Sequence, residues 1–221
     1  MLAIYVDDLF VTSTNLSMIK RFKLEMSTNF EMSDLGRLTY YLGIEVKQEE
    51  LGITINQEAY AQRILKEAGL HDCNPTHIPM EPGIKLSKTE DEPKINPTQY
   101  QKVVGCLRYF LQTRPDMAYA VGVVSRYMQS SRESHGGAIK HILRYLRGTT
   151  GCGIKYERTG QRRLIGYSDS SHNVDPDDGR STTGHIFYYR SSPIMWCSQK
   201  QDTIALSSYE AEFMATMATA C

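Results

Sequence analysis

The sequence predicts an α+β protein, on three observations. Short runs of alternating apolar and polar residues indicate strands near the N-terminus, within 2–11 and 38–55. Three helical patterns, with apolar residues three and four positions apart, follow one another across 98–150. From residue 151 the period returns to that of strands, and one last helical pattern follows.

The first expected element is a hairpin over 2–11, in which an apolar run meets Asp7 and Asp8 and then resumes. A tight turn presents neighbouring carboxylates at its tip, and two such groups repel unless a cation such as Mg²⁺ neutralises them. An ordinary polar turn explains the same residues, because Asp is common in turns. Further along we expect a helix over 16–30, strands over 38–47 and 53–55, and a helix over 60–68 that ends at Gly69.

Prolines separate this region from a basic helical one. Residues 71–97 hold five of the eight prolines and are expected to form a linker, before helices over 100–111, 117–128 and 139–146. The segment 98–160 carries ten Lys and Arg against three acids, a charge of +7 in a chain of zero net charge. This imbalance favours contact with a nucleic-acid backbone, and an ordinary solvated surface explains it equally well.

The third of these helices carries a basic stripe. Lys140, Arg144 and Arg147 are spaced four and three residues apart, so they line one side of it beside the apolar positions.

A second pair of acids lies in the last part of the chain. Strands over 154–156 and 163–168 flank a turn, and the second ends at Asp169. Strands over 186–189 and 194–197 follow, and a helix from residue 207 has Glu210 and Glu212 in its first turn. If that helix packs across the strand, Asp169 and a helix carboxylate can share a metal. Acids also favour helix N-termini, and Asp169 suits a turn, so a structural role stays open.

The bulk properties limit the class of protein. No stretch approaches the length of apolar sequence that a membrane helix needs. Asp7 and Asp8 interrupt the first apolar run, which is therefore not a signal peptide. The five cysteines are scattered, which favours reduced thiols and an intracellular protein that is not secreted.

Several motifs occur in the order and spacing of one known family. Tyr5-Val6-Asp7-Asp8 resembles the metal-binding motif of reverse transcriptases, and the stretch from Leu35 to Val46 resembles their primer-grip hairpin. Segments 104–109, 113–116 and 143–149 are similar to a connection region, and 167–169, 180–184, 196–201 and 205–212 to an RNase H domain. Along its whole length the sequence resembles the Pol polyprotein of copia-type LTR retrotransposons.

This resemblance implies RNA-directed DNA synthesis and cleavage of RNA–DNA hybrids with Mg²⁺ or Mn²⁺, acting on hybrid or primer–template in a cytoplasmic particle or the nucleus. It divides the chain into palm tail and thumb (1–70), linker (71–97), basic connection (98–150) and the first part of RNase H (151–221). The residues that it implicates are the metal-binding catalytic Asp7, Asp8, Asp169 and Glu212 (with Glu210 as the alternative), Tyr41, Leu42 and Gly43 at the primer, and Lys140, Arg144 and Arg147 on nucleic acid.

The resemblance also implies that metal ligands are missing. The third polymerase carboxylate and the remaining RNase H carboxylates of the family would lie outside these 221 residues. Two-metal chemistry needs several ligands on each ion, so we expect the chain alone to be inactive and its cations incompletely liganded. The alternative function is that of a non-catalytic nucleic-acid-binding remnant. No membrane partner is expected, and the oligomeric state is left open.

Overall fold

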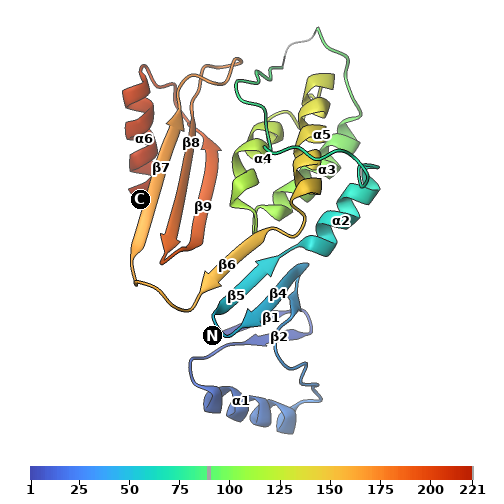
Figure 1. Cartoon of the computed structure of the whole chain (residues 1–221), viewed down its shortest axis with the longest axis vertical. Coiled ribbons are helices and arrows are strands. Elements are labelled where there is room, and N and C mark those ends of the chain that lie inside the picture. Colours follow the sequence, from blue (N-terminus) through green and yellow to red (C-terminus); the bar gives the residue numbers. More distant parts are fainter. Residues whose placement is uncertain (89–90, 221) are drawn as a thin grey trace. The chain divides into compact units, whose positions relative to one another are not determined.

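The computed structural model describes residues 1–88 and 91–220 (Figure 1). Helices occur together with several small sheets, which confirms the predicted mixture of α and β structure. The chain forms two compact units, one over Met1–Leu42 and one that begins at Gly43. Within the described ranges, every helix is too short or too polar to cross a membrane.

The first unit contains the predicted hairpin. Its strands β1 (Leu2–Tyr5) and β2 (Asp8–Val11) pair antiparallel, with Tyr5 opposite Asp8 at the end of the ladder. Val6 and Asp7 therefore make a two-residue turn, and Val6 adopts a positive φ of 51°.

The helix predicted behind the hairpin is confirmed as α1 (Leu16–Asn29), whose N-cap is Asn15. Its apolar side chains remain accessible: Leu16 is 72% and Leu24 68% exposed. Every residue of Met1–Leu42 is described and none is buried, so α1 covers no core within this unit.

The prediction of one continuous strand over 38–47 is wrong. Two strands, β3 (Tyr40–Tyr41) and β4 (Ile44–Glu49), replace it. Between them Leu42 and Gly43 have φ angles of 49° and 79°, a left-handed conformation that an extended strand cannot contain. The alternation of apolar residues continued through this turn and concealed it.

The core of the second unit is helical. It is built by α2 (Glu58–Glu67), α3 (Pro97–Phe110), α4 (Ala118–Ser125) and α5 (Glu133–Gly148), with a short 3₁₀ turn over Pro115–Met117. These helices confirm the periodicities in the sequence, because the same apolar positions are buried. The largest fully buried side chains include Leu65, Leu107, Phe110, Met117, Ile142, Leu143 and Leu146.

One antiparallel sheet joins segments about a hundred residues apart. β4 pairs with β5 (Gly52–Asn56), and β5 pairs with β6 (Gly153–Glu157) from Gly52 opposite Glu157 to Asn56 opposite Gly153. The sequence suggested instead that 154–156 and 163–168 flank one turn. The two strands belong to different sheets, because β6 is paired along β5.

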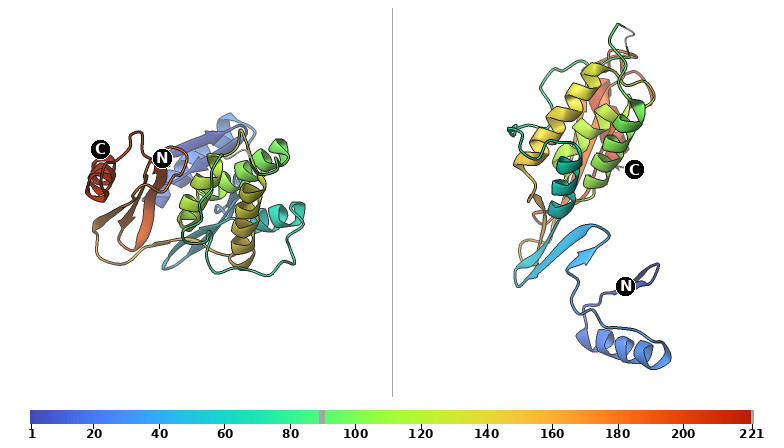
Figure 2. Two further views of the ribbon diagram at one scale, coloured as in Figure 1. Left: turned by 90° about the horizontal axis from the view of Figure 1, so that it is seen from above. Right: turned by 90° about the vertical axis from the view of Figure 1, so that its right-hand side faces the viewer.

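The last part of the chain is a three-stranded meander with one helix. β7 (Leu164–Ser171), β8 (Thr182–Tyr189) and β9 (Ser192–Lys200) pair in order, and α6 (Ser208–Ala220) follows. The sheet lies between α6, which packs along β7 and β8, and α4, which packs against β9 (Figures 1 and 2). Ala211 and Ala215 of α6 are fully buried, and such small side chains allow the helix to approach the sheet closely.

The segment expected to be a linker is held against the helices where it is described; residues 89–90 of it lie outside the described ranges, as does residue 221. Leu86 is only 3% exposed, and its carbonyl oxygen accepts from the Tyr127 hydroxyl at 2.5 Å. Further along, Glu92 Oε2 accepts from the Ser134 N–H at 2.9 Å. This segment is a packed strap over the helical core.

Candidate functional site

The first candidate site is the tip of the β1–β2 hairpin. Asp7 lies in the turn, Asp8 opens β2, and both are exposed. The Phe10 ring of β2 lies 6.1 Å from the Tyr41 ring, centroid to centroid, so one predicted primer-grip residue lies beside the strand that carries Asp8. Leu42, the next predicted primer-grip residue, ends this unit with a positive φ of 49°.

The second unit opens with the remaining predicted primer-grip residue, Gly43. A Cβ atom there would come 3.3 Å from the Tyr109 hydroxyl oxygen of α3. Both the positive φ and this close approach favour glycine at the position.

The second candidate site is formed by β7 and α6. Asp169 is exposed near the end of β7, and the backbone N–H of the next residue, Ser170, donates to Glu212 Oε1 at 3.3 Å. Glu210 is engaged elsewhere, because its Oε2 accepts from the Leu206 N–H at 2.7 Å, just before α6. Glu212 rather than Glu210 therefore lies against the strand that carries Asp169.

Gln201 fixes the position of α6 on this strand. Its side chain is 7% exposed, and its Nε2 donates to Ser170 Oγ at 3.2 Å, to Thr183 Oγ1 at 3.0 Å and to the Ala211 carbonyl at 3.0 Å. These contacts tie the first turn of α6 to β7 and β8, and so hold Glu212 beside β7.

The two carboxylate pairs suit hard cations in kind but are incomplete in number. Mg²⁺ binds carboxylates and commonly fills its other positions with water and substrate phosphates. In residues 1–88 and 91–220, no group of three or more His, Cys, Asp or Glu is placed to hold a metal. Each pair therefore offers chemically suitable ligands without forming a complete protein cage.

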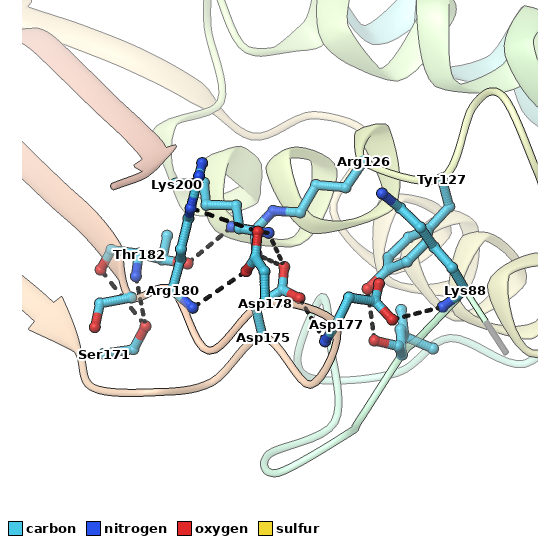
Figure 3. Close-up of polar contacts among 12 residues, drawn as sticks. Lys88, Arg126, Tyr127, Ser171, Asp175, Asp177, Asp178, Arg180, Thr182 and Lys200 are labelled. Atoms are coloured by element: carbon cyan, nitrogen blue, oxygen red, sulfur yellow. Dashed lines mark hydrogen bonds and ion pairs between the residues drawn. The ribbon is translucent and has the colours of Figure 1, made fainter. Parts of the chain in front are cut away.

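A buried acid holds the meander onto the helices (Figure 3). Asp175, in the loop between β7 and β8, is 4% exposed, and its Oδ2 lies 3.2 Å from Arg126 Nη1 and 2.5 Å from Lys200 Nζ. Arg126 also donates to Thr182 Oγ1 at 2.8 Å. These contacts link the end of α4 to the loop, to β8 and to β9.

The charges around Asp175 keep it ionised. Burial raises the pKa of this carboxyl, but Lys200, the Asp177 N–H and Arg126 outweigh it, so the pKa lies below its usual value. Sequence motifs gave no sign of this network, because its basic members are 49 and 25 residues away in the chain.

The basic segment is less open to solvent than its charge suggests. Arg114 is 2% exposed and pairs with Asp116 at 2.7 Å while donating to the Thr149 carbonyl at 2.9 Å. Arg132 is 5% exposed. These two guanidinium groups are structural, and the charge that reaches solvent is smaller than the sequence count.

The predicted basic stripe on α5 also contacts the strap. Arg144 Nε donates to the Asn74 carbonyl at 2.8 Å, and Arg147 Nε donates to the His71 carbonyl. A carbonyl does not neutralise a guanidinium charge, so both retain it. Lys140 is exposed, and no carboxylate of the described residues pairs with it.

Comparisons with known proteins agree with these features. The reverse transcriptase (RNA-dependent DNA polymerase) family matches residues 1–82. Over 95% of its length the chain is 37% identical to the retrovirus-related Pol polyprotein from transposon RE1 of Arabidopsis thaliana, and over 99% it is 35% identical to that from transposon TNT 1-94 of Nicotiana tabacum. It spans only 14% and 17% of those two proteins.

A shorter relative is matched over most of its own length. A putative transposon Ty5-1 protein of Saccharomyces cerevisiae is 31% identical over 99% of this chain, which covers 72% of that protein. No solved structure matches. The chain belongs to the family of copia-type retrotransposon Pol polyproteins.

Proposed function

We propose that this chain is part of a retrotransposon enzyme that synthesises DNA on RNA and cleaves the RNA of RNA–DNA hybrids. Asp7 and Asp8 act as polymerase metal ligands, and Asp169 and Glu212 as RNase H ligands. The cation, Mg²⁺ or Mn²⁺, supplies Lewis-acid activation of phosphate oxygens when it is bound. Tyr41, Leu42 and Gly43 position the primer end, and Lys140, Arg144 and Arg147 hold the nucleic-acid backbone.

The observation that carries this proposal is the contact between Glu212 and the backbone of Ser170. It supports a shared role for a strand acid and a helix acid that are 43 residues apart in the sequence. A cation held by both acids needs Glu212 beside the strand that carries Asp169, and this contact supports that arrangement. We further propose that the isolated chain performs neither reaction efficiently, because each pair supplies two carboxylates where two cations need more.

The second candidate is a nucleic-acid-binding remnant without catalysis. The contacts of Arg144 and Arg147 with the strap favour it, because they orient uncompensated positive charges on α5 without any metal. Binding of this kind weakens steeply with added salt.

Metal-linked binding separates the two candidates. The affinity of the purified chain for a labelled RNA–DNA hybrid is measured by fluorescence anisotropy with Mn²⁺ and with chelator, for the wild type and for Asp169→Asn. The enzyme-derived function predicts that Mn²⁺ strengthens binding in the wild type and not in the variant. An affinity that does not depend on Mn²⁺ in either protein would favour the second candidate, a nucleic-acid-binding remnant without catalysis.

A further inference from the structure

A second basic surface lies on the sheet of β7, β8 and β9, away from the stripe on α5. Its floor consists of Ile165 and Tyr167 on β7 with Ile186 and Tyr188 on β8, and Arg190 stands at its end. Together with Ser191 these residues line an open cavity of about 560 Å³. We refer to this surface, together with the neighbouring Arg158, Arg162 and Arg163, as the tyrosine–arginine shelf.

Strand register places the two tyrosines on one face. Tyr167 is opposite Ile186 and Ile165 is opposite Tyr188, so the tyrosines are diagonal neighbours across the ladder. Their ring centroids are 6.1 Å apart with the rings at 85°. Tyr167 is 59% exposed, so much of its ring surface reaches solvent.

Backbone contacts gather the arginines at the end of this floor. The Arg190 N–H donates to the Arg163 carbonyl at 2.9 Å. Its Nη1 donates to the carbonyl of Glu157, at 3.1 Å, and to that of Arg158. These contacts bring the backbone of Arg158 and Arg163 to Arg190, so the loop that carries Arg158, Arg162 and Arg163 lies next to the end of this floor.

The charge of this group is not cancelled. Among the described residues, no carboxylate forms an ion pair with Arg158, Arg162, Arg163 or Arg190. The first three are exposed, in the loop between β6 and β7. Clustered arginines beside exposed aromatic rings combine the two features that bind single-stranded nucleic acid: positive charge for phosphates and flat surfaces for bases.

The shelf is bounded on one side and open toward the candidate site. Trp196 of β9 is opposite Ile186, and its indole N–H donates to the Leu111 carbonyl at 2.8 Å, so the helices cover the β9 side. Along β7, Asp169 follows Tyr167 by two residues and therefore shares its face of the strand. A strand lying on the tyrosines would run along β7 toward Asp169.

We infer that the tyrosine–arginine shelf binds a single-stranded segment of nucleic acid, with unpaired bases on Tyr167 and Tyr188 and phosphates at the arginines. The inference rests on the proposed function for the kind of ligand, and adds a binding surface to the candidate site. Single strands are favoured over duplex because only unpaired bases expose faces for stacking.

The test is anisotropy of a labelled single-stranded oligonucleotide of about 15 nucleotides, titrated with the purified chain at several salt concentrations. Tyr167→Ala should weaken binding roughly 5- to 100-fold, whereas Tyr167→Phe should keep it, because stacking needs the ring and not the hydroxyl. Arg162→Gln combined with Arg163→Gln should make the binding less sensitive to salt. The slope of log K against log salt concentration should become shallower by about 0.7 for each phosphate contact that is lost. Thermal melting confirms that each variant is folded.

Matched controls separate this inference from the proposed function. Tyr119→Ala removes an exposed tyrosine of α4, and Arg21→Gln removes an exposed arginine of α1; neither should change the affinity. If the shelf variants bind like the wild type while Lys140→Gln weakens binding, the inference about the shelf is wrong and the proposed function stands. If Tyr167→Ala weakens duplex and single strand equally, base stacking is wrong. A wild type that binds no nucleic acid would overturn both.

Discussion

Asp175 is the residue on which α4, β9 and the β7–β8 loop converge. Replacing it with asparagine keeps the size of the side chain and removes the charge that faces Arg126 and Lys200. We expect the free energy of unfolding to fall by about 2–3 kcal/mol, below the full cost of breaking a buried pair because both partners are partly exposed. Urea denaturation measures the change.

The matched control for Asp175 is its neighbour Asp178. That carboxylate also pairs with Lys200, at 2.7 Å, but its side chain is 38% exposed. Asp178→Asn should cost no more than about 1 kcal/mol. Equal losses from the two substitutions would mean that burial of Asp175 does not govern its contribution.

His135 makes stability depend on pH. The ring is fully buried against Tyr127; its Nδ1 accepts from the Arg132 N–H at 2.9 Å, so its Nε2 carries the hydrogen that is shared with the Ser87 carbonyl at 3.0 Å. Burial lowers the pKa of His135 below its usual 6.5, although the Ser87 carbonyl opposes this shift. The folded state therefore requires the neutral ring.

The sign of the pH dependence follows from that lowered pKa. The stabilisation is complete above about pH 6.5, and it declines as the pH falls toward the folded pKa, because only the unfolded chain then takes up the proton. For a single group, the loss cannot exceed about 1.4 kcal/mol per pH unit. His135→Gln should lose this component, so unfolding of both proteins is compared at pH 7.5 and 5.5. Equal pH dependence in the two would exclude His135 as its source.

At the scale of single residues, the sequence could predict which acids matter but not how each is used. The helix dipole explains Glu210 and Glu212 equally well, because both lie near the start of the same helix. Only the direction of each side chain separates them, and this depends on how Gln201 holds α6 against β7. No sequence motif marked Asp175, because the residues that it pairs with, Arg126 and Lys200, are distant in the chain.

At the scale of elements, the pairing of β5 with β6 depends on two glycines, Gly52 in β5 and Gly153 in β6. A Cβ atom on Gly153 would overlap the Ile55 carbonyl oxygen of β5. Gly153→Ala should therefore destabilise the protein by about 2–3 kcal/mol. Gly137→Ala in α5 is the control, because nothing lies within 4 Å of the new Cβ, and it should be neutral or stabilise by up to about 1 kcal/mol. Denaturant midpoints of the two variants test whether the strands are this close.

Elements were predictable from local periodicity, whereas their partners were not. The hairpin around Asp7 and the helices of the core follow from patterns within a dozen residues. The pairing of β6 with β5 joins residues about a hundred apart, and the turn at Leu42 and Gly43 keeps the apolar alternation intact. Proline content indicated a linker over 71–97, but burial of Leu86 makes it a strap.

At the scale of the whole molecule, the second unit combines a helical core with two sheets. One sheet pairs β5 with the distant β6, and the other is the meander that Asp175 joins to the helices. This arrangement fixes β7, and β7 carries both Asp169 and Tyr167. The proposed cation site and the proposed strand-binding shelf therefore depend on the same strand. Loss of the Asp175 contacts should disturb both, although Asp175 belongs to neither.

The measurement that tests the central claim most directly is cleavage of a labelled RNA–DNA hybrid by the purified chain, with Mn²⁺ and with chelator, beside Asp169→Asn. We predict salt-sensitive binding of the hybrid and no cleavage above the level of the variant, because two carboxylates do not complete a two-metal site. Mn²⁺-dependent cleavage by the wild type that is absent in Asp169→Asn would contradict this account, since Asp169 and Glu212 would then suffice for catalysis.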